Sequence, residues 1–441
     1  MKIPAIKGFD KEAFEKYLKN TGMLMFGKVG SLVIKMLVTI QIANYLQPEN
    51  FGILNGVIIY VMLFAAVASL GLDQVIVKEL HTYPKERDRI LGTAFRMKFI
   101  AGLVCIPMIY LSWFFFSLED TPYIYVLILS FIGIFQSFNV IDSYFQAEVR
   151  SKYIMQLQIA CTLFSALIKM VLIYTESPLE LFIYASIADF IWLALGYFII
   201  YNRKGRRLLN WSFDPKLSKK LIAFSWPLII SGIMVSLYMN IDQLMLHEMI
   251  GPAAQGTYTT AVNFSAALYF IPSVIVSSLF PAILNARRDD PERYQKRLQN
   301  LYDLMVWFSM SFALAVTFAS PFIYKLMPEY SDAAPILAVH VWSGVFVFLG
   351  TANGQFMIAE DLNKLTFFRT GIGAVINIIL NLWLIPLMGI MGAAIATLVA
   401  YFAATFFIFF IPGLRQQAIM MFKSLFLITL VQKISERSNK A

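Results

Sequence analysis

The chain has 441 residues, of which 59% are apolar and 14% charged, and its formal net charge is +9. Soluble domains average about 45–50% apolar and about 25% charged residues, so the composition excludes a soluble globular protein, a disordered chain and a coiled coil. Continuous apolar runs, rather than alternating segments of about ten residues, also argue against an outer-membrane β-barrel. Cys105 and Cys161 both lie in apolar runs and cannot make a disulfide framework. An all-α polytopic membrane protein is therefore predicted.

Apolar stretches long enough to cross a bilayer recur about twelve times, since a core about 30 Å thick requires roughly 20 apolar residues in a helix. The predicted spans are 20–46, 52–70, 90–116, 123–146, 153–174, 179–201, 220–246, 257–284, 301–324, 334–359, 365–387 and 390–412. No cleavable signal peptide is predicted before them, because the charged segment FDKEAFEKYLKN lacks a small-residue cleavage site. Near the C-terminus, QQAIMMFKSLFLITLVQKISER fits an interfacial helix or a thirteenth span, and Lys423 and Lys433 favour the interfacial helix.

The distribution of Lys and Arg predicts how these spans are oriented. Six of the 36 basic residues fall within spans beyond their first residue, and Lys325 alone falls in an odd-numbered loop. The others occupy the termini and the even-numbered loops, so the positive-inside rule places both termini in the cytoplasm. Because this bias accounts for the net charge, the RKGRR sequence at 203–207 indicates topology and not a nucleic-acid partner.

Three short motifs recur in the same order in the two halves of the chain. They are Pro48-x-x-x-Gly52 with Pro252-x-x-x-Gly256, Pro84-Lys-Glu-Arg87 with Pro291-Glu-Arg293, and Ala147-Glu148-x-x-x-Lys152 with Ala359-Glu360-x-x-x-Lys364. An even number of spans in each half makes the halves parallel, as in transporters with two lobes and alternating access. We predict an N-terminal six-helix lobe at 1–201, a basic cytoplasmic linker at 202–219, a C-terminal six-helix lobe at 220–412 and a cytoplasmic amphipathic tail at 413–441.

The basic residues within the predicted spans are Lys28, Lys35, Arg96, Lys98, Lys169 and Arg369. A charge in hydrocarbon costs roughly 2.5–3.5 kcal/mol, so each must face a cavity, pair with an acid or extend to the interface. Lys35 lies near the midplane of the first span, where it cannot easily reach the interface, and it shares a polar stripe with Lys28. For the four in later spans, extension to the membrane surface is the alternative to a place in a cavity.

Three acids also lie within spans beyond the first turn, namely Asp142, Asp189 and Asp242. Asp189 is the deepest and is a candidate partner for a deep lysine. For each acid, structural pairing and ion coupling are both open, with H⁺ or Na⁺ as the coupling ion. The excess of bases over acids predicts a cavity for an anion, most naturally a phosphate or pyrophosphate, whereas a cation exporter would be expected to show the reverse.

No catalytic constellation, cofactor site or metal site is predicted. The sequence contains no Walker A motif, and His81, His247 and His340 are widely spaced. The energy for transport would then come from an ion gradient, the membrane potential or consumption of the substrate on the far side. An inside-negative potential favours outward movement of an anion by about 2.3 kcal/mol per charge per 100 mV.

Several loose motifs carry a family resemblance that extends over essentially the whole chain. They are Asn20-Thr-Gly-Met with Lys28, Ala43-Asn44-Tyr45-Leu46 before Pro48-Glu-Asn-Phe-Gly52, Gly71-Leu-Asp73 with Val77-Lys-Glu79, Asn240-Ile-Asp242-Gln-Leu-Met-Leu246, and Asn381-Leu-Trp-Leu-Ile-Pro386 with Gly389-Ile-Met-Gly392-Ala-Ala-Ile-Ala-Thr397. Together they resemble the Wzx-like lipid-linked oligosaccharide flippases of the polysaccharide transporter family, in the multidrug/oligosaccharidyl-lipid/polysaccharide (MOP) exporter superfamily.

This resemblance implies a V-shaped, MATE-like bundle of two six-helix lobes that is a flippase and not an enzyme. The implied substrate is an undecaprenyl-pyrophosphate-linked oligosaccharide, moved between leaflets of the bacterial cytoplasmic membrane for O-antigen or capsule assembly, with membrane lipid and the polymerase machinery as neighbours. Since lipid II flippases often have extra C-terminal spans, twelve spans favour the O-antigen or capsule class. The residues implied to line the cationic cavity are Lys28, Lys35, Arg96, Lys98, Lys169 and Arg369.

Two other functions stay open. A multidrug or organic-cation antiporter of the same superfamily would be expected to have a surplus of acids in its cavity. A membrane polymerase or ligase acting on lipid-linked sugars would be expected to have a large, charged loop on the outer side. The odd-numbered loops SLEDTP, TESPLE and HEMIGPAAQG are short and contain no Lys or Arg, which argues against the enzyme.

Overall fold

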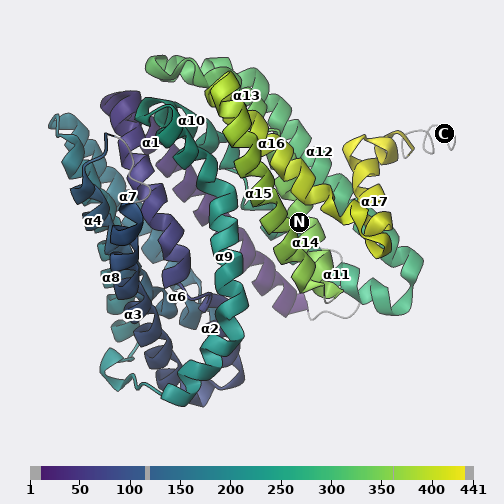
Figure 1. Cartoon of the computed structure of the whole chain (residues 1–441). Helices are drawn as coiled ribbons and strands as arrows, with labels where there is room; N and C mark the ends of the chain where they lie inside the picture. Colours follow the sequence, from purple (N-terminus) through teal and green to yellow (C-terminus); the bar gives the residue numbers. More distant parts are fainter. Residues whose placement is uncertain (1–10, 115–119, 361, 433–441) are drawn as a thin grey trace. The chain divides into compact units, whose positions relative to one another are not determined.

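A computed structural model describes residues 11–114, 120–360 and 362–432, and this part of the chain is almost entirely helical (Figure 1). The α-helices are α1 (Lys11–Ala68), α2 (Asp73–Thr82), α3 (Arg87–Trp113), α4 (Tyr123–Ser130), α5 (Ile132–Gln136), α6 (Val140–Ala147), α7 (Lys152–Tyr174), α8 (Leu179–Arg203), α9 (Pro215–Met249), α10 (Pro252–Ala266), α11 (Ile271–Asp289), α12 (Pro291–Ile323), α13 (Ala333–His340), α14 (Ser343–Ala359), α15 (Asn363–Met388), α16 (Ile390–Phe406) and α17 (Arg415–Leu425). The short 3₁₀ turns are η1 (Pro84–Glu86), η2 (Ser137–Asn139), η3 (Leu208–Asn210), η4 (Tyr324–Leu326), η5 (Pro328–Tyr330), η6 (Phe407–Phe410) and η7 (Pro412–Leu414).

Eleven helical segments of the described chain are long and apolar enough to cross a membrane. The first, Val29–Thr82, has 54 residues and a kink at Gln47. At 1.5 Å per residue this segment would extend about 80 Å, more than twice the thickness of a bilayer core, so it covers most of the first predicted span and all of the second. The predicted all-helical, multi-pass class is therefore confirmed.

The fourth and tenth predicted spans are each broken into shorter helices. Residues 123–146 form α4, α5, η2 and α6, and residues 334–359 form α13 and α14 with a break at Val341 and Trp342. Backbone that departs from α-helical geometry at membrane depth is tolerated where protein or water satisfies its polar groups. Hydropathy alone predicted two continuous helices here, because it reports burial in lipid and not local backbone geometry.

The chain enters its second and eighth spans through the same kind of turn. Gln47 has φ 63° and ψ 168°, and Gly251 has φ 124° and ψ 173°; each directly precedes a helical proline. Proline is favoured at a first helical position because it lacks the N–H that would stay unpaired there. The left-handed φ is easy for Gly251 but strained for Gln47, which indicates that the surrounding structure holds this turn in place. The first repeated motif therefore marks a repeated turn.

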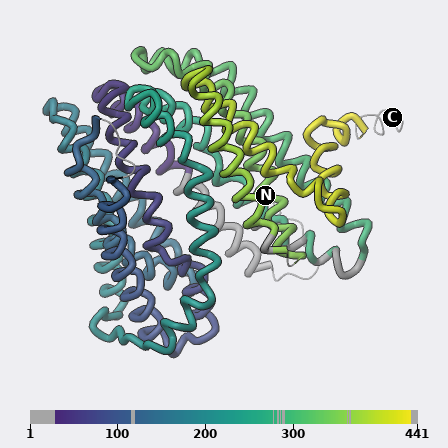
Figure 2. The backbone as a smooth tube through the Cα atoms, in the orientation of Figure 1, coloured from purple at the N-terminus to yellow at the C-terminus, as the bar shows by residue number. Residues whose placement is uncertain are grey.

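The described chain divides into two compact units. Unit 1 comprises Met1–Tyr45, Tyr60–Ser117 and Thr121–Gly232, and unit 2 comprises Leu46–Ile59, Leu118–Asp120 and Ile233–Ala441. In unit 1, α7 packs against α8 and α3 against α5; in unit 2, α15 packs against α16 and α12 against α14. The long helices within each unit run side by side (Figure 2). The lobe boundaries predicted at 201 and 220 stay predictions.

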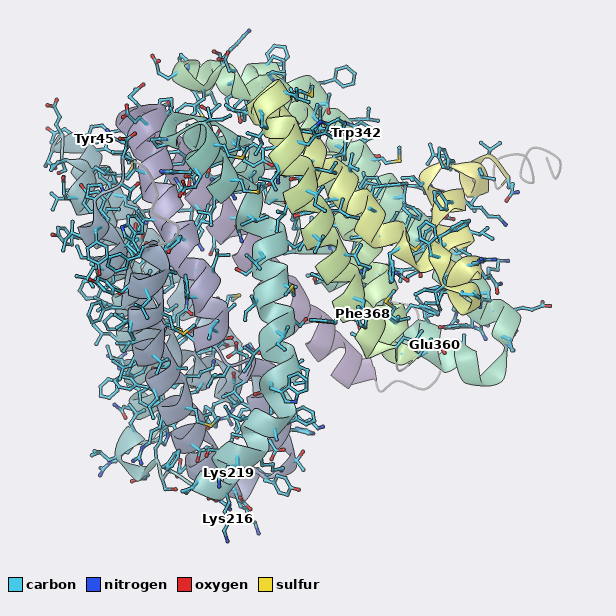
Figure 3. All side chains as sticks on the ribbon, in the orientation of Figure 1. Tyr45, Lys216, Lys219, Trp342, Glu360 and Phe368 are labelled. Atoms are coloured by element: carbon cyan, nitrogen blue, oxygen red, sulfur yellow. The ribbon has the colours of Figure 1, made fainter. Side chains whose placement is uncertain are left out.

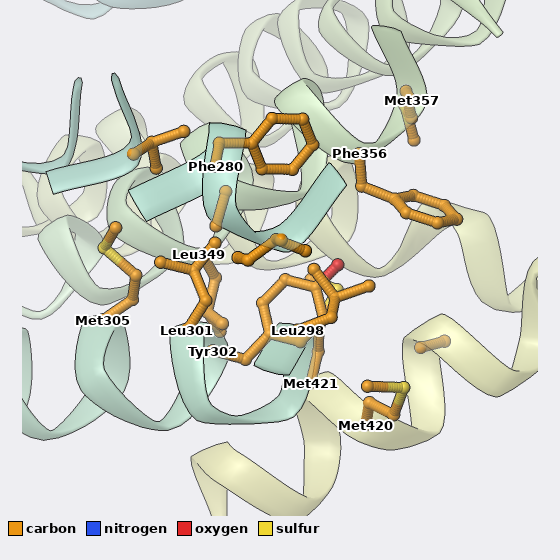
Figure 4. Close-up of a cluster of buried hydrophobic side chains, with 14 of the residues drawn as sticks. Phe280, Leu298, Leu301, Tyr302, Met305, Leu349, Phe356, Met357, Met420 and Met421 are labelled. Carbon is orange, nitrogen blue, oxygen red and sulfur yellow. The ribbon is translucent and has the colours of Figure 1, made fainter. Parts of the chain in front are cut away.

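Each unit has its own hydrophobic core. The core of unit 1 gathers side chains of α2, α3, α6 and α8 with Trp211 of the linker. In unit 2, Phe280, Leu298, Tyr302 and Leu349 pack into one cluster with methionines of α17 (Figure 4). At roughly 1.5–3 kcal/mol for each fully buried large side chain, these cores stabilise the packing within each unit.

The C-terminal segment packs on unit 2. Asp303 of α12 is 1% exposed and accepts hydrogen bonds from the hydroxyls of Ser424 and Thr429, both at 2.6 Å. Met420 and Met421 of α17 join the hydrophobic cluster described above. Within the described residues, the last candidate span ends at Phe410, so α17 is not one of the candidate spans.

Candidate substrate pathway and coupling site

Lys98 is buried in unit 1 and paired with an acid. Its side chain lies on α3, the residue is 2% exposed, and its ammonium forms an ion pair with the carboxylate of Asp73 in the first turn of α2. Removing one partner of such a pair would leave an uncompensated buried charge. Lys98 therefore holds α2 against α3, and its charge is already neutralised in this structure.

Lys169 is likewise paired within unit 1. Its Nζ lies 2.7 Å from Oδ2 of Asp189, across the contact between α7 and α8. The two side chains are 18% and 32% exposed, so the pair is partly shielded from its surroundings. Asp189, which the sequence singled out as a partner for a deep lysine, thus pairs with a lysine of the neighbouring helix.

Lys35 has a different environment. Its side chain is exposed on α1, between Val33 and Leu37, which are 48% and 59% exposed. Within the described part of the chain, no carboxylate forms an ion pair with Lys35. An ammonium is costly in hydrocarbon, so at the midplane position predicted for Lys35 it would require water or a counter-ion. The side chain of Lys28, predicted to share this stripe, lies outside the described residues.

Arg96 of α3 lies beside the linker that precedes α9. Its guanidinium carbon is 5.7 Å from the ring centroid of Phe213, a cation–π contact, and the residue is exposed. The adjacent Asp214 accepts a hydrogen bond from the backbone N–H of Lys216 at 2.7 Å, and this bond, together with the nearby Arg89 guanidinium, lowers the pKa of the carboxyl. Lys216 and its neighbour Lys219 project from the start of α9 (Figure 3), so Arg96 belongs to a basic end of unit 1.

Asp142, the third acid predicted within a span, lies on the short helix α6. Its Oδ1 accepts a hydrogen bond from Nε2 of Gln146, one turn further along, at 3.1 Å. The contact is local and places Asp142 on the same polar face as Gln146.

Asp242 is the centre of a buried polar cluster in unit 2. The residue is 3% exposed, and its Oδ2 accepts hydrogen bonds from the hydroxyls of Tyr258 on α10, at 2.6 Å, and Thr397 on α16, at 2.8 Å. Its Oδ1 accepts the backbone N–H of Gln243 at 2.8 Å. Among the described residues, no Lys, Arg or His forms an ion pair with Asp242. A buried carboxylate held only by neutral donors can bind a proton or a small cation without first breaking an ion pair.

Two asparagines of α15 extend this cluster. Nδ2 of Asn377 donates to the hydroxyl of Thr397 at 3.2 Å, and Nδ2 of Asn381 donates to Oδ1 of Asn377 at 3.0 Å. Both asparagines are fully buried, and Oδ1 of Asn381 has no hydrogen-bond partner among the described residues. An unpaired buried acceptor is costly, and a coordinated cation or an ordered water would satisfy it.

Arg369 is the basic residue of unit 2 that the sequence predicted. Its Nη1 donates to the backbone carbonyl of Gly350 on α14 at 2.8 Å. Gly350 and Gly354 are one turn apart and leave room for the guanidinium, since a Cβ at Gly350 would lie 3.2 Å from Nη1. No carboxylate pairs with Arg369 within the described residues, and its guanidinium is held by a carbonyl dipole.

Sequence reasoning identified the charged members of these groups but not all their partners. The contacts of Tyr258 and Thr397 with Asp242 were not predicted, although a hydroxyl on a membrane helix must find a hydrogen-bond partner. The spacing of Asn377 and Asn381, at i and i+4, is a signal in the sequence for one polar face. The contact with Asp242 needs three helices to meet, which spacing within one helix cannot show.

The model of the polysaccharide biosynthesis protein family matches residues 17–287, and the chain belongs to that family. A relative in Haloferax volcanii, described as "Probable flippase AglR", is 28% identical over 244 residues, which are 54% of this chain. The match spans 50% of that relative, so the chain aligns with about half of its length.

Two solved structures share the fold of this chain. The lipid II flippase MurJ, in an inward closed conformation, has a TM-score of 0.71 and 15% identity, and the match covers 93% of this chain and 92% of MurJ. An inward-facing multidrug resistance MATE family transporter has a TM-score of 0.71 and 14% identity, with 91% and 96% covered. These structures confirm the predicted MATE-like fold, and the family match confirms the predicted polysaccharide family, while the equal TM-scores do not distinguish flippase from antiporter.

Proposed function

We propose that this protein is a flippase that moves a lipid-linked oligosaccharide with a pyrophosphate link from the cytoplasmic leaflet to the outer leaflet, by alternating access. Membership of the polysaccharide biosynthesis family and the relative described as a flippase support this class of substrate. A pyrophosphate is the most strongly charged part of such a lipid. The protein must therefore offer it cations inside the membrane that are not already neutralised.

The observation that carries the proposal is the presence of cations without acidic partners. Lys35, Arg96 and Arg369 form no ion pair with a described carboxylate, whereas Lys98 and Lys169 do. Paired cations are poor anion sites, because a ligand would first have to displace the carboxylate. We therefore assign Lys35 and Arg369 to the substrate pathway and Arg96 to its cytoplasmic entrance, and we assign Lys98 and Lys169 to positioning. Lys28 stays a predicted member of the pathway.

The Asp242 cluster is proposed as the coupling site. Its carboxylate, its hydroxyls and the unpaired amide oxygen of Asn381 are all hard oxygen ligands, which suit Na⁺, while the carboxylate alone suits H⁺. Asp189 is less suited, because it is already paired with Lys169. Asp142 accepts a hydrogen bond from the amide of Gln146 on its own helix and stays a predicted member of the coupling group.

The lipid carrier, the glycan and the location that we propose next follow from the predicted topology and the family resemblance. We propose an undecaprenyl-pyrophosphate carrier, O-antigen or capsule repeat units, and a place in the bacterial cytoplasmic membrane with both termini in the cytoplasm. The basic end formed by Arg96, Lys216 and Lys219 would then face the cytoplasm, as the positive-inside rule requires. Polysaccharide polymerase machinery on the outer side would consume the product.

The test is a deletion strain in which surface polysaccharide and the leaflet of the lipid-linked oligosaccharide are measured together. Loss of surface glycan with complete repeat units trapped on the cytoplasmic leaflet is the expected result. Repeat units that reach the outer leaflet but stay unpolymerised would instead indicate a membrane polymerase or ligase. Re-expression of the wild-type chain is the control and should restore both readouts.

A cation-coupled multidrug antiporter is the second candidate, and one observation favours it. The fold matches a MATE transporter as well as it matches MurJ, and Asp242 is a buried acid without a basic partner. Unchanged glycan with altered tolerance to cationic drugs in the deletion strain would replace the flippase proposal by this one.

A further inference from the structure

The two Pro-x-x-x-Gly motifs contact each other. Leu46–Ile59, although it belongs to the N-terminal half of the sequence, is part of unit 2. A Cβ placed on Gly52 would lie 1.8 Å from the carbonyl oxygen of Pro252, and a Cβ on Gly256 would lie 2.1 Å from the carbonyl oxygen of Pro48. The contact is reciprocal, because each glycine faces the proline of the other motif.

Only glycine can occupy these two positions at this separation. A carbon atom approaches a carbonyl oxygen no closer than about 3.3 Å. A methyl group at Gly52 or Gly256 would therefore require the two helices to move apart by more than about 1 Å. The obstacle is backbone at both positions, so no side-chain rotation relieves it. Small residues at matching positions let membrane helices pack backbone against backbone, where van der Waals contact drives association.

A second layer lies one turn deeper in the same helix. Gly56 faces a buried pair formed by Nδ1 of His247 and Oε1 of Gln255, which are 2.5 Å apart. A Cβ at Gly56 would lie 2.7 Å from Oε1 of Gln255 and 2.9 Å from Nδ1 of His247. Here the obstacle is a pair of side-chain ends. The ring of Phe51, the chain neighbour of Gly52, packs edge-on against Tyr330.

We propose that Gly52 and Gly256 are positioning residues that close the extracytoplasmic side of the transport pathway, an inference that rests on the flippase function and topology proposed above. The motifs follow the first and seventh spans, and the positive-inside rule places both on the outer side. They are equivalent parts of two repeats, and alternating access moves one repeat against the other. The outer ends must therefore touch in one state and separate in the other, and this reciprocal contact is where they touch.

The experiment is an alanine series read by transport per membrane-inserted molecule. We expect Gly52→Ala and Gly256→Ala to reduce transport at least tenfold, because in both variants the added methyl group would meet the backbone of the other motif. A smaller loss of transport is expected for Gly56→Ala, because its added methyl group would meet the ends of side chains and not backbone. Gly371→Ala is the matched control, because Gly371 also lies within a helix but has open space around it, and its rate should match the wild type.

A second readout reports the contact without any substrate. Val57 has no exposed surface, and it lies in the same segment as Gly52, within the unit that also contains Gly256. In cells carrying Val57→Cys, the introduced thiol should resist a membrane-impermeant maleimide added outside. Adding Gly52→Ala or Gly256→Ala should raise its labelling rate at least tenfold, and Gly371→Ala should not. The parent chain without Val57→Cys controls for labelling of Cys105 and Cys161.

The outcomes separate this inference from the proposed function. Normal transport by both Gly52→Ala and Gly256→Ala would overturn the closing role of the two glycines. An introduced thiol at Val57→Cys that stays unreactive in both variants would overturn it as well. Labelling only in inside-out vesicles would overturn the assignment to the outer side. If the wild-type chain moves no glycan, the flippase proposal fails, and the thiol readout still decides whether the glycines hold this contact closed. Should Gly52→Ala not reach the membrane, Gly256→Ala and Gly56→Ala carry the same two readouts.

Discussion

Charged side chains within the predicted spans have different partners in the two units. In unit 1, Lys98 pairs with Asp73 and Lys169 pairs with Asp189, and both pairs join neighbouring helices. In unit 2, Asp242 is held by hydroxyls and a backbone N–H, and Arg369 by a backbone carbonyl. An ion pair fixes two helices and leaves no net charge, whereas a charge among neutral dipoles keeps its ability to attract an ion. The difference suggests that unit 2 responds to ions while the paired helices of unit 1 move as rigid elements.

Lys35 and Arg96 are exceptions within unit 1, and Lys35 provides the strongest test of this contrast. We expect Lys35→Ala to lower transport by about 100-fold or more, because an anionic substrate would lose a charge partner inside the membrane. The measurement is export of lipid-linked oligosaccharide per molecule of membrane-inserted protein. Lys35→Arg, which keeps the charge, should retain most of the activity. Normal transport by Lys35→Ala would remove this lysine from the substrate pathway.

Asp242 tests the contrast in unit 2. Asp242→Asn keeps an oxygen that accepts from Tyr258 and Thr397 but removes the charge, so we expect a folded protein with transport reduced about 10–100-fold. The residual rate should no longer respond to a pH or Na⁺ gradient. Asp303→Asn is the matched control, since Asp303 is equally buried and accepts from the hydroxyls of Ser424 and Thr429. Asp303→Asn should loosen the C-terminal segment and leave the response of transport to the gradient intact. Equal responses to the gradient in wild type and Asp242→Asn would refute the coupling role.

The sequence predicted those properties that depend on local composition. Apolar run length predicted the spans, the distribution of Lys and Arg predicted the orientation, and residue type at depth identified Lys35, Arg369 and Asp242. The repeated Pro-x-x-x-Gly motif was also visible in the sequence. These features could be predicted because they depend on the energy of placing one residue, or one short segment, in a membrane.

Long-range partners could not be predicted in the same way. Whether Lys98 is free or paired depends on where α2 folds back, and α2 is too short and too polar to stand out by hydropathy. Likewise, Asp242 meets Thr397, 155 positions away in the chain, only because α9 and α16 pack together within unit 2. The contact between Gly52 and Gly256 could be suspected from the repeat. Its reciprocity depends on the turns at Gln47 and Gly251, whose φ angles the sequence does not reveal.

The smallest effect on transport is expected at the pair between Lys169 and Asp189. If the pair only holds α7 against α8, removal of one partner should destabilise unit 1 by about 1–3 kcal/mol, less than for a fully buried pair because both side chains are partly exposed. The double change Lys169→Met with Asp189→Leu removes both charges while keeping similar side-chain volumes. It should restore the melting temperature in detergent to near the wild-type value.

Transport by this double variant then decides whether the pair is positional or functional. A rate within about twofold of the wild type would place both charges outside the substrate pathway, as the ion-pair geometry indicates. Loss of transport in a double variant with wild-type melting would show that Lys169 leaves Asp189 during the cycle and contacts the substrate. That outcome would reverse the contrast between the units, because a pair in unit 1 would then supply a charge to the pathway.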